Sequence, residues 1–168
     1  SGNPLNAYIA AGVATDHECE SVEEALEKVS KGMYVLIREG SQTRNLRTLI
    51  KAVNKTNLRR FLFCTDDRNI EDLVGLGTIG NAVRLAVECG MDPIDAITIA
   101  SLNANEAYGI KNTGAVAPGW TADFLVCADI TAQRVEKVFY HGALVAENGR
   151  PLFSVRPADT SGVTGTVH

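Results

Sequence analysis

Several patterns that would assign this chain to a common class are missing from its sequence. Its four cysteines (Cys19, Cys64, Cys89 and Cys127) are scattered, and no C-x-x-C pair occurs, which argues against a structural zinc knot. No apolar run reaches the roughly 18 residues that a membrane-spanning helix needs. The stretch 75–77 (GLG) lacks the remainder of a dinucleotide or Walker phosphate loop.

An excess of basic charge is missing as well. The formal net charge is -4 and the pI is about 5.4, which excludes the basic surface of a nucleic-acid-binding protein. The chain starts with Ser-Gly-Asn, without Met or a signal-peptide pattern, so we expect it to begin inside a longer protein. Free, buried thiols indicate a reducing, cytoplasmic location.

The composition that is present is that of a globular protein. The 168 residues, 45% hydrophobic and 21% charged, suffice for one domain with a real core or one domain plus an appendage. In the first part, hydrophobic spacing predicts helices over 4–11, 23–30 and 45–54 that alternate with strands over 12–15, 33–37 and 61–64. Ser21 and Glu24 form the capping box of the second helix. This order with short loops predicts an α/β fold with a parallel sheet.

The pattern changes in the second part. Helices are predicted over 70–76, 79–89, 93–101 and 103–108, followed by antiparallel strands over 122–128, 134–140 and 144–146. Residues 156–168 are rich in Ser, Thr and Gly and are expected to be a linker or frayed end. The chain therefore divides into an α/β part (1–112), a β part (113–155) and a tail (156–168).

Polar residues follow each of the three predicted parallel strands. The motifs are 15–18 (TDHE), 38–41 (REGS) and 64–68 (CTDDR). Barrel-type α/β enzymes build their active sites from side chains at the carboxyl ends of such strands. We therefore expect His17, Glu39 and Asp66 to converge on one pocket, as part of the wall of a metal-assisted hydrolase site.

Longer stretches give a family resemblance. Residues 5–12 (LNAYIAAG), 16–18 (DHE), 37–41 (IREGS) and 63–68 (FCTDDR) resemble adenine deaminases of the amidohydrolase superfamily in order and spacing. Residues 114–123 (GAVAPGWTAD) resemble amidohydrolases more widely, at the point where the chain leaves the barrel. One departure is Thr78, where that family usually has His.

The resemblance implies that the chain is a fragment. It covers the last three β/α units, strands six to eight, of a TIM-like (β/α)8 barrel, plus part of a small antiparallel β domain. The His-x-His pair of the first strand, the bridging carboxylate and another His ligand would lie upstream. The tail would lead toward a missing C-terminal domain.

The implied activity is conversion of adenine and water to hypoxanthine and ammonia in purine salvage by a cytoplasmic homo-oligomer. The implied cofactor is a divalent metal, manganese or iron, with zinc as an alternative, which lowers the pKa of water to about 7. His17 and Asp66 would be the metal ligands, and Asp66 would also shuttle the proton. Glu39 would be a further catalytic residue, with Glu18, Ser41, Asp67 and Arg38 contacting substrate or supporting the ligands.

Plainer roles stay open for these residues. His17 could be a capping or loop histidine, and the adjacent Asp66 and Asp67 could cap a turn. Two adjacent carboxylates point in different directions, so at most one of the pair is expected to reach the metal. The resemblance favours Asp66, because the strand-eight Asp of that family directly follows the small polar residue that Thr65 matches, and Asp67 is the alternative. Glu39 could simply pair with Arg38 or Arg44 in a solvated loop.

Other functions also compete with the leading one. The chain could come from another amidohydrolase, such as a deacetylase or a cyclic-amide hydrolase. It could also be a non-catalytic folding unit that self-associates, because three strands cannot close an eight-stranded barrel. The zinc nucleobase deaminases are excluded, because His17-Glu18-Cys19 does not match H-x-E and P-C-x-x-C is absent.

Overall fold

A three-stranded parallel sheet is the centre of the first part of the chain. The computed structural model describes residues 2–130, 134–155, 157–160 and 162. The strands β1 (Thr15–Asp16), β2 (Tyr34–Arg38) and β3 (Phe61–Cys64) lie in the order β1-β2-β3. Thr15 pairs with Tyr34, and Val35 pairs with Phe61. The sequence prediction of a parallel sheet is confirmed.

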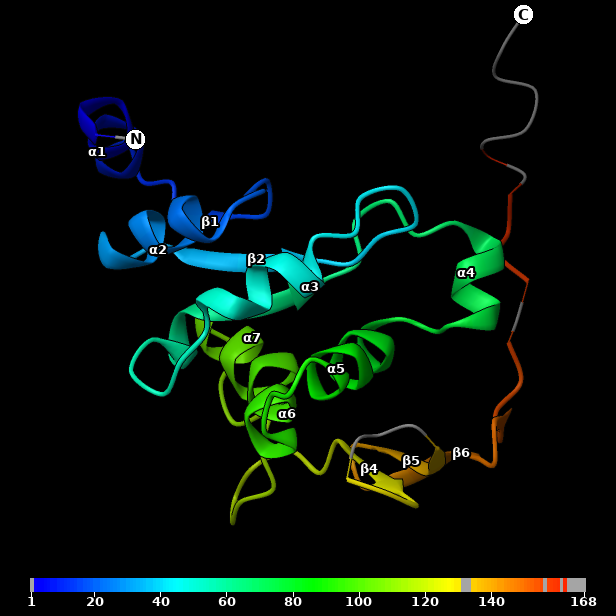
Figure 1. Ribbon diagram of the computed structural model, residues 1–168. Coiled ribbons are helices and arrows are strands. Elements are labelled where there is room, and N and C mark those ends of the chain that lie inside the picture. Colours follow the sequence, from blue (N-terminus) through cyan, green and yellow to red (C-terminus); the bar gives the residue numbers. More distant parts are fainter. Residues whose placement is uncertain (1, 131–133, 156, 161, 163–168) are drawn as a thin grey trace, which may run out of the picture.

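Helices connect the strands and cover one face of the sheet (Figure 1). The chain opens with α1 (Gly2–Ala10), and α2 (Val22–Ser30) joins β1 to β2. Between β2 and β3 lie α3 (Leu46–Leu49) and the 3-10 helices η1 (Ile50–Ala52) and η2 (Leu58–Arg60). After β3 come α4 (Ile70–Gly75), α5 (Ile79–Glu88), α6 (Pro93–Ala100) and α7 (Leu102–Ala107).

The start of α2 follows from its capping residues. The Ser21 hydroxyl accepts a hydrogen bond from the Glu24 backbone N–H at 3.2 Å, which satisfies one of the free donors of the first turn. The Glu24 carboxylate accepts from the backbone N–H of Glu20 at 3.2 Å, one residue before the expected position of a capping box. The predicted helix start is therefore correct.

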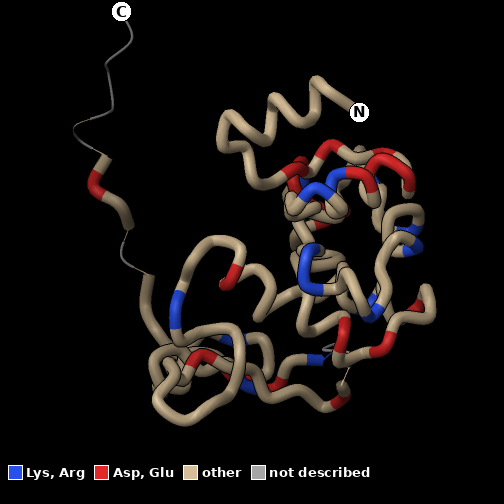
Figure 2. The backbone as a smooth tube through the Cα atoms, turned by 90° about the vertical axis from the view of Figure 1, so that its left-hand side faces the viewer, with Lys and Arg blue, Asp and Glu red and all other residues tan. Residues whose placement is uncertain are grey.

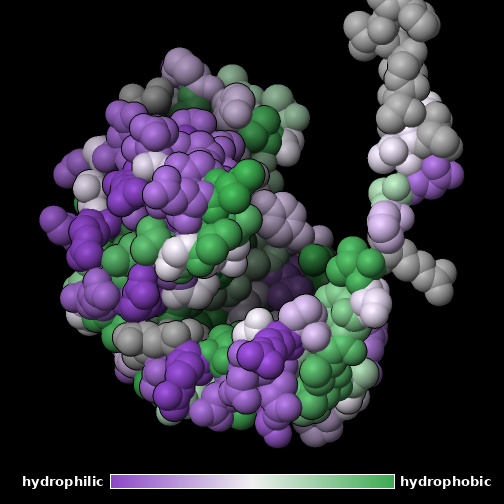
Figure 3. Space-filling view, turned by 90° about the vertical axis from the view of Figure 1, so that its right-hand side faces the viewer, coloured by the Kyte–Doolittle hydropathy of each residue, from purple (hydrophilic) through white to green (hydrophobic). Residues whose placement is uncertain are grey.

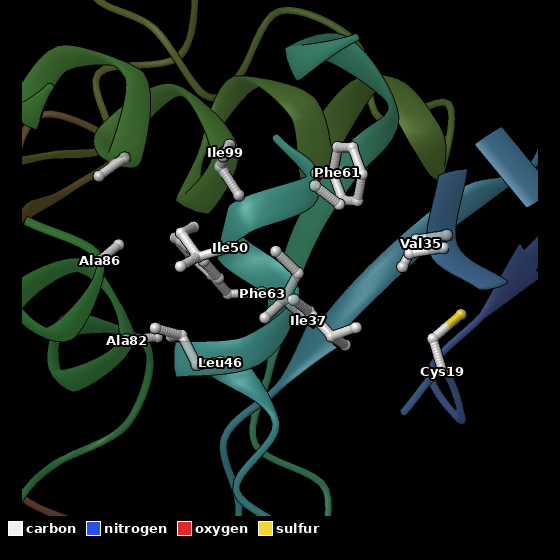
Figure 4. Close-up of a cluster of buried hydrophobic side chains, with 14 of the residues drawn as sticks. Cys19, Val35, Ile37, Leu46, Ile50, Phe61, Phe63, Ala82, Ala86 and Ile99 are labelled. Atoms are coloured by element: carbon white, nitrogen blue, oxygen red, sulfur yellow. The ribbon is translucent and has the colours of Figure 1, made fainter. Parts of the chain in front are cut away.

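Side-chain alternation along the strands decides which residues enter the core. Val35 and Ile37 of β2 and Phe61 and Phe63 of β3 are buried in one cluster beneath the helices (Figure 4). Successive side chains in a strand point to opposite faces, so Leu36 and Arg38 point away from this cluster. The same alternation, continued by one residue, directs Glu39 back toward the helices.

A second sheet follows the helices. It is antiparallel, with strands β4 (Phe124–Cys127), β5 (Val135–Tyr140), β6 (Ala143–Glu147) and β7 (Arg150–Pro151) in chain order. The Phe124 and Phe139 rings stack at 4.5 Å between centroids and join β4 to β5. In Figure 1 this sheet lies beyond α5 and α6. The short strand β7 was not predicted.

Two predicted elements differ from the structure. The helix expected over 45–54 is only α3 followed by η1, because Val53 is extended and the Asn54 side chain accepts hydrogen bonds from the N–H groups of Thr56 and Asn57. The strand expected over 12–15 is shorter and begins later, as β1 (Thr15–Asp16). Gly12 has a φ of 95°, the left-handed conformation of a helix C-terminus, and pairing with β2 begins at Thr15.

The surface is mixed in charge and polarity. Figure 2 shows basic and acidic segments interleaved along the tube. Figure 3 shows hydrophobic residues beside hydrophilic ones on the face that carries α4, where Ile70 and Val74 are about four-fifths exposed. Among the described residues, no helix has the length and hydropathy to cross a bilayer. Of the predicted tail, residues 156, 161 and 163–168 lie outside the described residues.

The core predicts a large effect for one isoleucine and a small effect for another. Ile37→Ala removes a fully buried side chain and should lower the free energy of unfolding by about 2–5 kcal/mol. Ile70→Ala, at a residue that is 79% exposed, should change it by less than about 0.5 kcal/mol. Urea unfolding followed by circular dichroism measures both. Equal effects would contradict this account of the core.

The thiols should differ in reactivity. Burial raises the pKa of Cys19 to about 12 and that of Cys64 to about 11, whereas Cys89 is exposed. Only the thiolate attacks a disulfide reagent, so at about pH 8 Cys89 should react with an aromatic disulfide well before Cys19 and Cys64. Cys89→Ser should remove that fast phase. Burial also raises the pKa of Cys127, so a fast phase that survives this substitution would show that Cys19, Cys64 or Cys127 is more accessible than in this structure.

Candidate active site

Four polar side chains from the ends of all three parallel strands meet at one edge of the sheet. His17 and Glu18 directly follow β1, Arg38 is the last residue of β2, and Asp66 lies two residues after β3. The His17 Nε2 atom lies 3.2 Å from Glu18 Oε1 and 4.0 Å from Asp66 Oδ1. We call these four residues the strand-end cluster.

Arg38 holds the strand-end cluster together. Its side chain is 6% exposed, and Nη1 donates to Glu18 Oε2 at 2.8 Å and lies 3.3 Å from Asp66 Oδ2. Burial alone would lower the pKa of Arg38, but the carboxylates of Glu18 and Asp66 raise it above its ordinary value. Arg38 is thus a permanent cation that fixes two carboxylates beside His17.

The structure separates the two adjacent aspartates. Asp66 has a φ of 48°, a left-handed conformation that Asp tolerates better than most residues, and its carboxylate joins the strand-end cluster. Asp67 instead accepts a hydrogen bond from the Gln42 backbone N–H at 2.8 Å, and this bond holds the pKa of Asp67 below its usual value. The geometry therefore favours Asp66 over Asp67 as a candidate ligand.

The Asp67 side chain connects the loop after β2 to the loop after β3. A Cβ atom added to Gly40 would lie 1.6 Å from Asp67 Oδ1 and 2.9 Å from the Thr65 carbonyl oxygen, so only glycine fits at this position. The Ser41 hydroxyl accepts from the Asn69 N–H at 2.9 Å across the same contact. Ser41 and Asp67 thus join the loop after β2 to the loop that carries Asp66, and neither belongs to the strand-end cluster.

The sequence analysis predicted that Glu39 would converge with His17 and Asp66, and the structure shows that this prediction is wrong. Its carboxylate is buried on the helix side of β2, where Oε2 accepts from the Leu46 backbone N–H at 3.3 Å. Burial raises the pKa of Glu39. The physical reason is strand alternation. Arg38 points to the face of the sheet away from the helices, so its neighbour Glu39 must point to the helix side.

A second group near β1 was missed by sequence reasoning. Oxygen and sulfur atoms of Asp16, Cys19 and Glu24 lie within 4.8 Å of one another, but the Lys28 ammonium lies at 2.7 Å from Asp16 and 2.5 Å from Glu24. Burial would raise the pKa of Asp16, yet its hydrogen bonds with Lys28 and Cys19 keep that pKa below its usual value. The spacing of Glu24 and Lys28, four residues apart on one helix face, could have predicted their ion pair from the sequence. A lysine already neutralises this group, so we interpret it as structural.

The donor chemistry of the strand-end cluster suits a divalent cation. An imidazole nitrogen and a carboxylate oxygen on one tetrahedral cation lie roughly 3–3.5 Å apart, since each bond is about 2.0–2.2 Å. The 4.0 Å between His17 Nε2 and Asp66 Oδ1 needs only a small side-chain adjustment. Both side chains are partly exposed, at 46% and 37%, which leaves them accessible. The described part of the chain offers two such ligands here, fewer than a complete site requires.

Helices on a parallel sheet, with titratable side chains gathered at the carboxyl ends of its strands, define a mixed α/β protein. Residues 3–145 match the amidohydrolase family, and the chain belongs to that family. It is also similar to curated adenine deaminases, with 47% identity over 165 residues to adenine deaminase 2 of Desulfotalea psychrophila and 48% over 157 residues to adenine deaminase of Geobacillus kaustophilus.

These matches are partial in one direction. They cover 98% and 94% of this chain but only 29% and 27% of the two relatives, so the chain spans less than a third of their length. Among solved structures, an enamidase of the amidohydrolase superfamily has a TM-score of 0.66 at 21% identity, covering 88% of this chain and 44% of that one. That likeness supports the fold.

The Gly40–Asp67 contact predicts opposite effects at two glycines. Gly40→Ala would force Asp67 and the Thr65 backbone apart and should lower the free energy of unfolding by about 1–3 kcal/mol. Gly80→Ala, in α5 with nothing within 4 Å of the added Cβ, should raise it by about 0.5–1 kcal/mol. Urea unfolding of both variants checks this. A harmless Gly40→Ala would mean that the two loops are not interlocked.

Proposed function

We propose that this chain is a segment of an adenine deaminase, the enzyme that converts adenine and water to hypoxanthine and ammonia. The observation that carries the proposal is the strand-end cluster, in which His17 and Asp66 come together at 4.0 Å from separate strands. Its support is the similarity to adenine deaminases at 47% identity over nearly the whole chain.

In this proposal the parallel sheet forms strands six to eight of a (β/α)8 barrel. Residues 1–112 belong to the barrel and residues 113–155 to a β domain, while 156–168 lead toward a further domain. The parallel order β1-β2-β3 and the separate antiparallel sheet support this division. The complete enzyme is expected to be a cytoplasmic homo-oligomer.

His17 and Asp66 would hold the divalent cation, manganese or iron, with zinc as the alternative, together with ligands from outside this chain. Such a cation, when bound, lowers the pKa of water to about 7 and so makes a nucleophile available at neutral pH. The Asp66 carboxylate would also accept the proton of the attacking water and pass it to the leaving amino group.

The remaining residues would position these two. Arg38 binds Asp66 Oδ2 and so directs Oδ1 toward His17. Glu18 lies 3.2 Å from His17 and shares Arg38 with Asp66, and it is exposed enough, at 63%, to accept a hydrogen bond from the purine ring. Asp67 and Ser41 fix the loop that presents Asp66, and Glu39 fixes the start of α3 from the opposite face.

A chimaera tests the activity. This chain should replace the matching segment of the Desulfotalea psychrophila adenine deaminase, which would supply the rest of the barrel. Adenine, an N-acetyl sugar and a cyclic ureide are then offered as substrates, and ammonia or product release is measured. We expect turnover of adenine alone. A folded chimaera that hydrolyses the amide substrates instead would favour the deacetylase or cyclic-amide hydrolase alternative and overturn the proposal.

Substitutions in the chimaera test the assigned roles. Asp66→Asn and His17→Ala should each lower kcat by about 100-fold or more, because each removes a ligand and, for Asp66, the proton acceptor. Asp67→Asn is the matched control, since its amide oxygen still accepts from Gln42, and it should lose less than about tenfold. If Asp67→Asn is the more damaging change, the assignment of the two aspartates must be exchanged.

The chain by itself should be inactive and self-associating. Its two ligands are too few for the metal site, and β1 and β3 are both sheet edges with unpaired backbone groups. Purified chain with added manganese or iron should release no ammonia from adenine, and sedimentation should show species larger than a monomer. Measurable turnover, or a single sharp monomer boundary, would contradict the respective half of this prediction.

A further inference from the structure

A hollow of about 270 Å³ lies on the helix side of the sheet, away from the strand-end cluster. We call it the arginine pocket, because four of its lining residues are arginines. They come from four segments: Arg44 before α3, Arg47 in α3, Arg68 after β3 and Arg84 in α5. At about 30 Å³ for each water molecule, the hollow has room for a small solute and several waters.

Three of the four arginines already have acidic partners. Arg44 pairs with Asp72 at 3.3 Å, Arg47 pairs with Glu88 at 3.2 Å, and Arg84 lies 3.8 Å from the same Glu88. These carboxylates hold the guanidinium groups in place around the hollow. These two carboxylates do not neutralise the positive charge of the three arginines fully, because Arg47 and Arg84 share Glu88.

Arg68 is the exception. Its Nε and Nη2 atoms are buried and have no hydrogen-bond partner within the described part of the chain. Burying a charged donor without an acceptor is costly, so an acceptor is expected beside these atoms. The two adjacent N–H groups form the fork that binds a carboxylate or phosphate through two oxygens.

Glu39 is the acidic residue that lines the arginine pocket, but it does not serve as that acceptor. Its Oε2 accepts from the Leu46 N–H. The positive charge of Arg68 is close enough to act against the rise in the pKa of Glu39, but no hydrogen bond joins Glu39 to the Nε or Nη2 atom of Arg68. The four arginines face three nearby carboxylates, those of Glu39, Asp72 and Glu88, which leaves one positive charge in excess.

We propose that the arginine pocket binds a tetrahedral oxyanion of phosphate size, held by Arg47, Arg68 and Arg84. The Arg68 side chain would turn on binding, so that its Nε and Nη2 atoms, which have no exposed surface in this structure, reach the oxyanion. The oxyanion would supply the missing acceptor and the missing negative charge together. It would also tie the loop after β3 to α3 and α5. This inference does not depend on the proposed deaminase activity, since the pocket lies on the other side of β2.

Calorimetric titration of the 168-residue chain with inorganic phosphate tests the proposal, with chloride at matched ionic strength as the blank. We expect saturable binding of one phosphate. Arg68→Gln should weaken it by about tenfold or more, because two charge-assisted hydrogen bonds are lost. Arg134→Gln is the matched control at an exposed arginine just before β5 and should bind as the unchanged chain does.

A parallel titration with adenosine monophosphate identifies the source of the oxyanion. If free phosphate is the natural occupant, adenosine monophosphate should bind more weakly than inorganic phosphate, because the ester is bulkier. If the natural occupant is the phosphoryl group of a nucleotide, adenosine monophosphate should bind equally or more tightly. Arg84→Gln is a second variant, in case Arg68→Gln alters the circular dichroism spectrum, and should also weaken binding. No saturable binding of phosphate, or equal binding by the unchanged chain and both pocket variants, would overturn the proposal.

Discussion

The arrangement of this molecule depends on the alternation of side chains where β2 ends. Arg38 points to one face of the sheet and organises Glu18, Asp66 and His17, whereas Glu39 points to the other and lies among arginines. A shift of the strand register by one residue would exchange the two faces and destroy both groups at once. The buried side chains Val35 and Ile37 fix that register, because they fit only on the helix side.

Much of the fold could be predicted from local pattern. The strand over 61–64 is a short continuous apolar run, and the helices near 79–89 and 93–101 have helical apolar spacing and clear ends. The structure has all three within a residue or two. The helix over 45–54 was overestimated because apolar spacing continues through Val53, while the Asn54 side chain competes for the backbone donors that a helix would use.

The candidate site was predictable in location and less so in detail. Polar residues after parallel strands must gather at one edge, which brought His17 and Asp66 together. Which of two adjacent residues faces that edge depends on the register of a single strand, and sequence alone did not decide it for Arg38 and Glu39. Asp67 illustrates the same limit, because its partner Gly40 is distant in sequence and stands out only as part of the motif 38–41 (REGS).

The left-handed backbone at Asp66 has a consequence for how this position can vary. Under the proposed function the residue would satisfy two unrelated demands, a carboxylate for the reaction and a backbone with φ of 48°. Glutamate meets the first demand but is poorly suited to the second, and asparagine or glycine meets the second but not the first. Aspartate is the one standard amino acid that meets both demands. The backbone conformation therefore restricts the amino acids that this position accepts more than the reaction does.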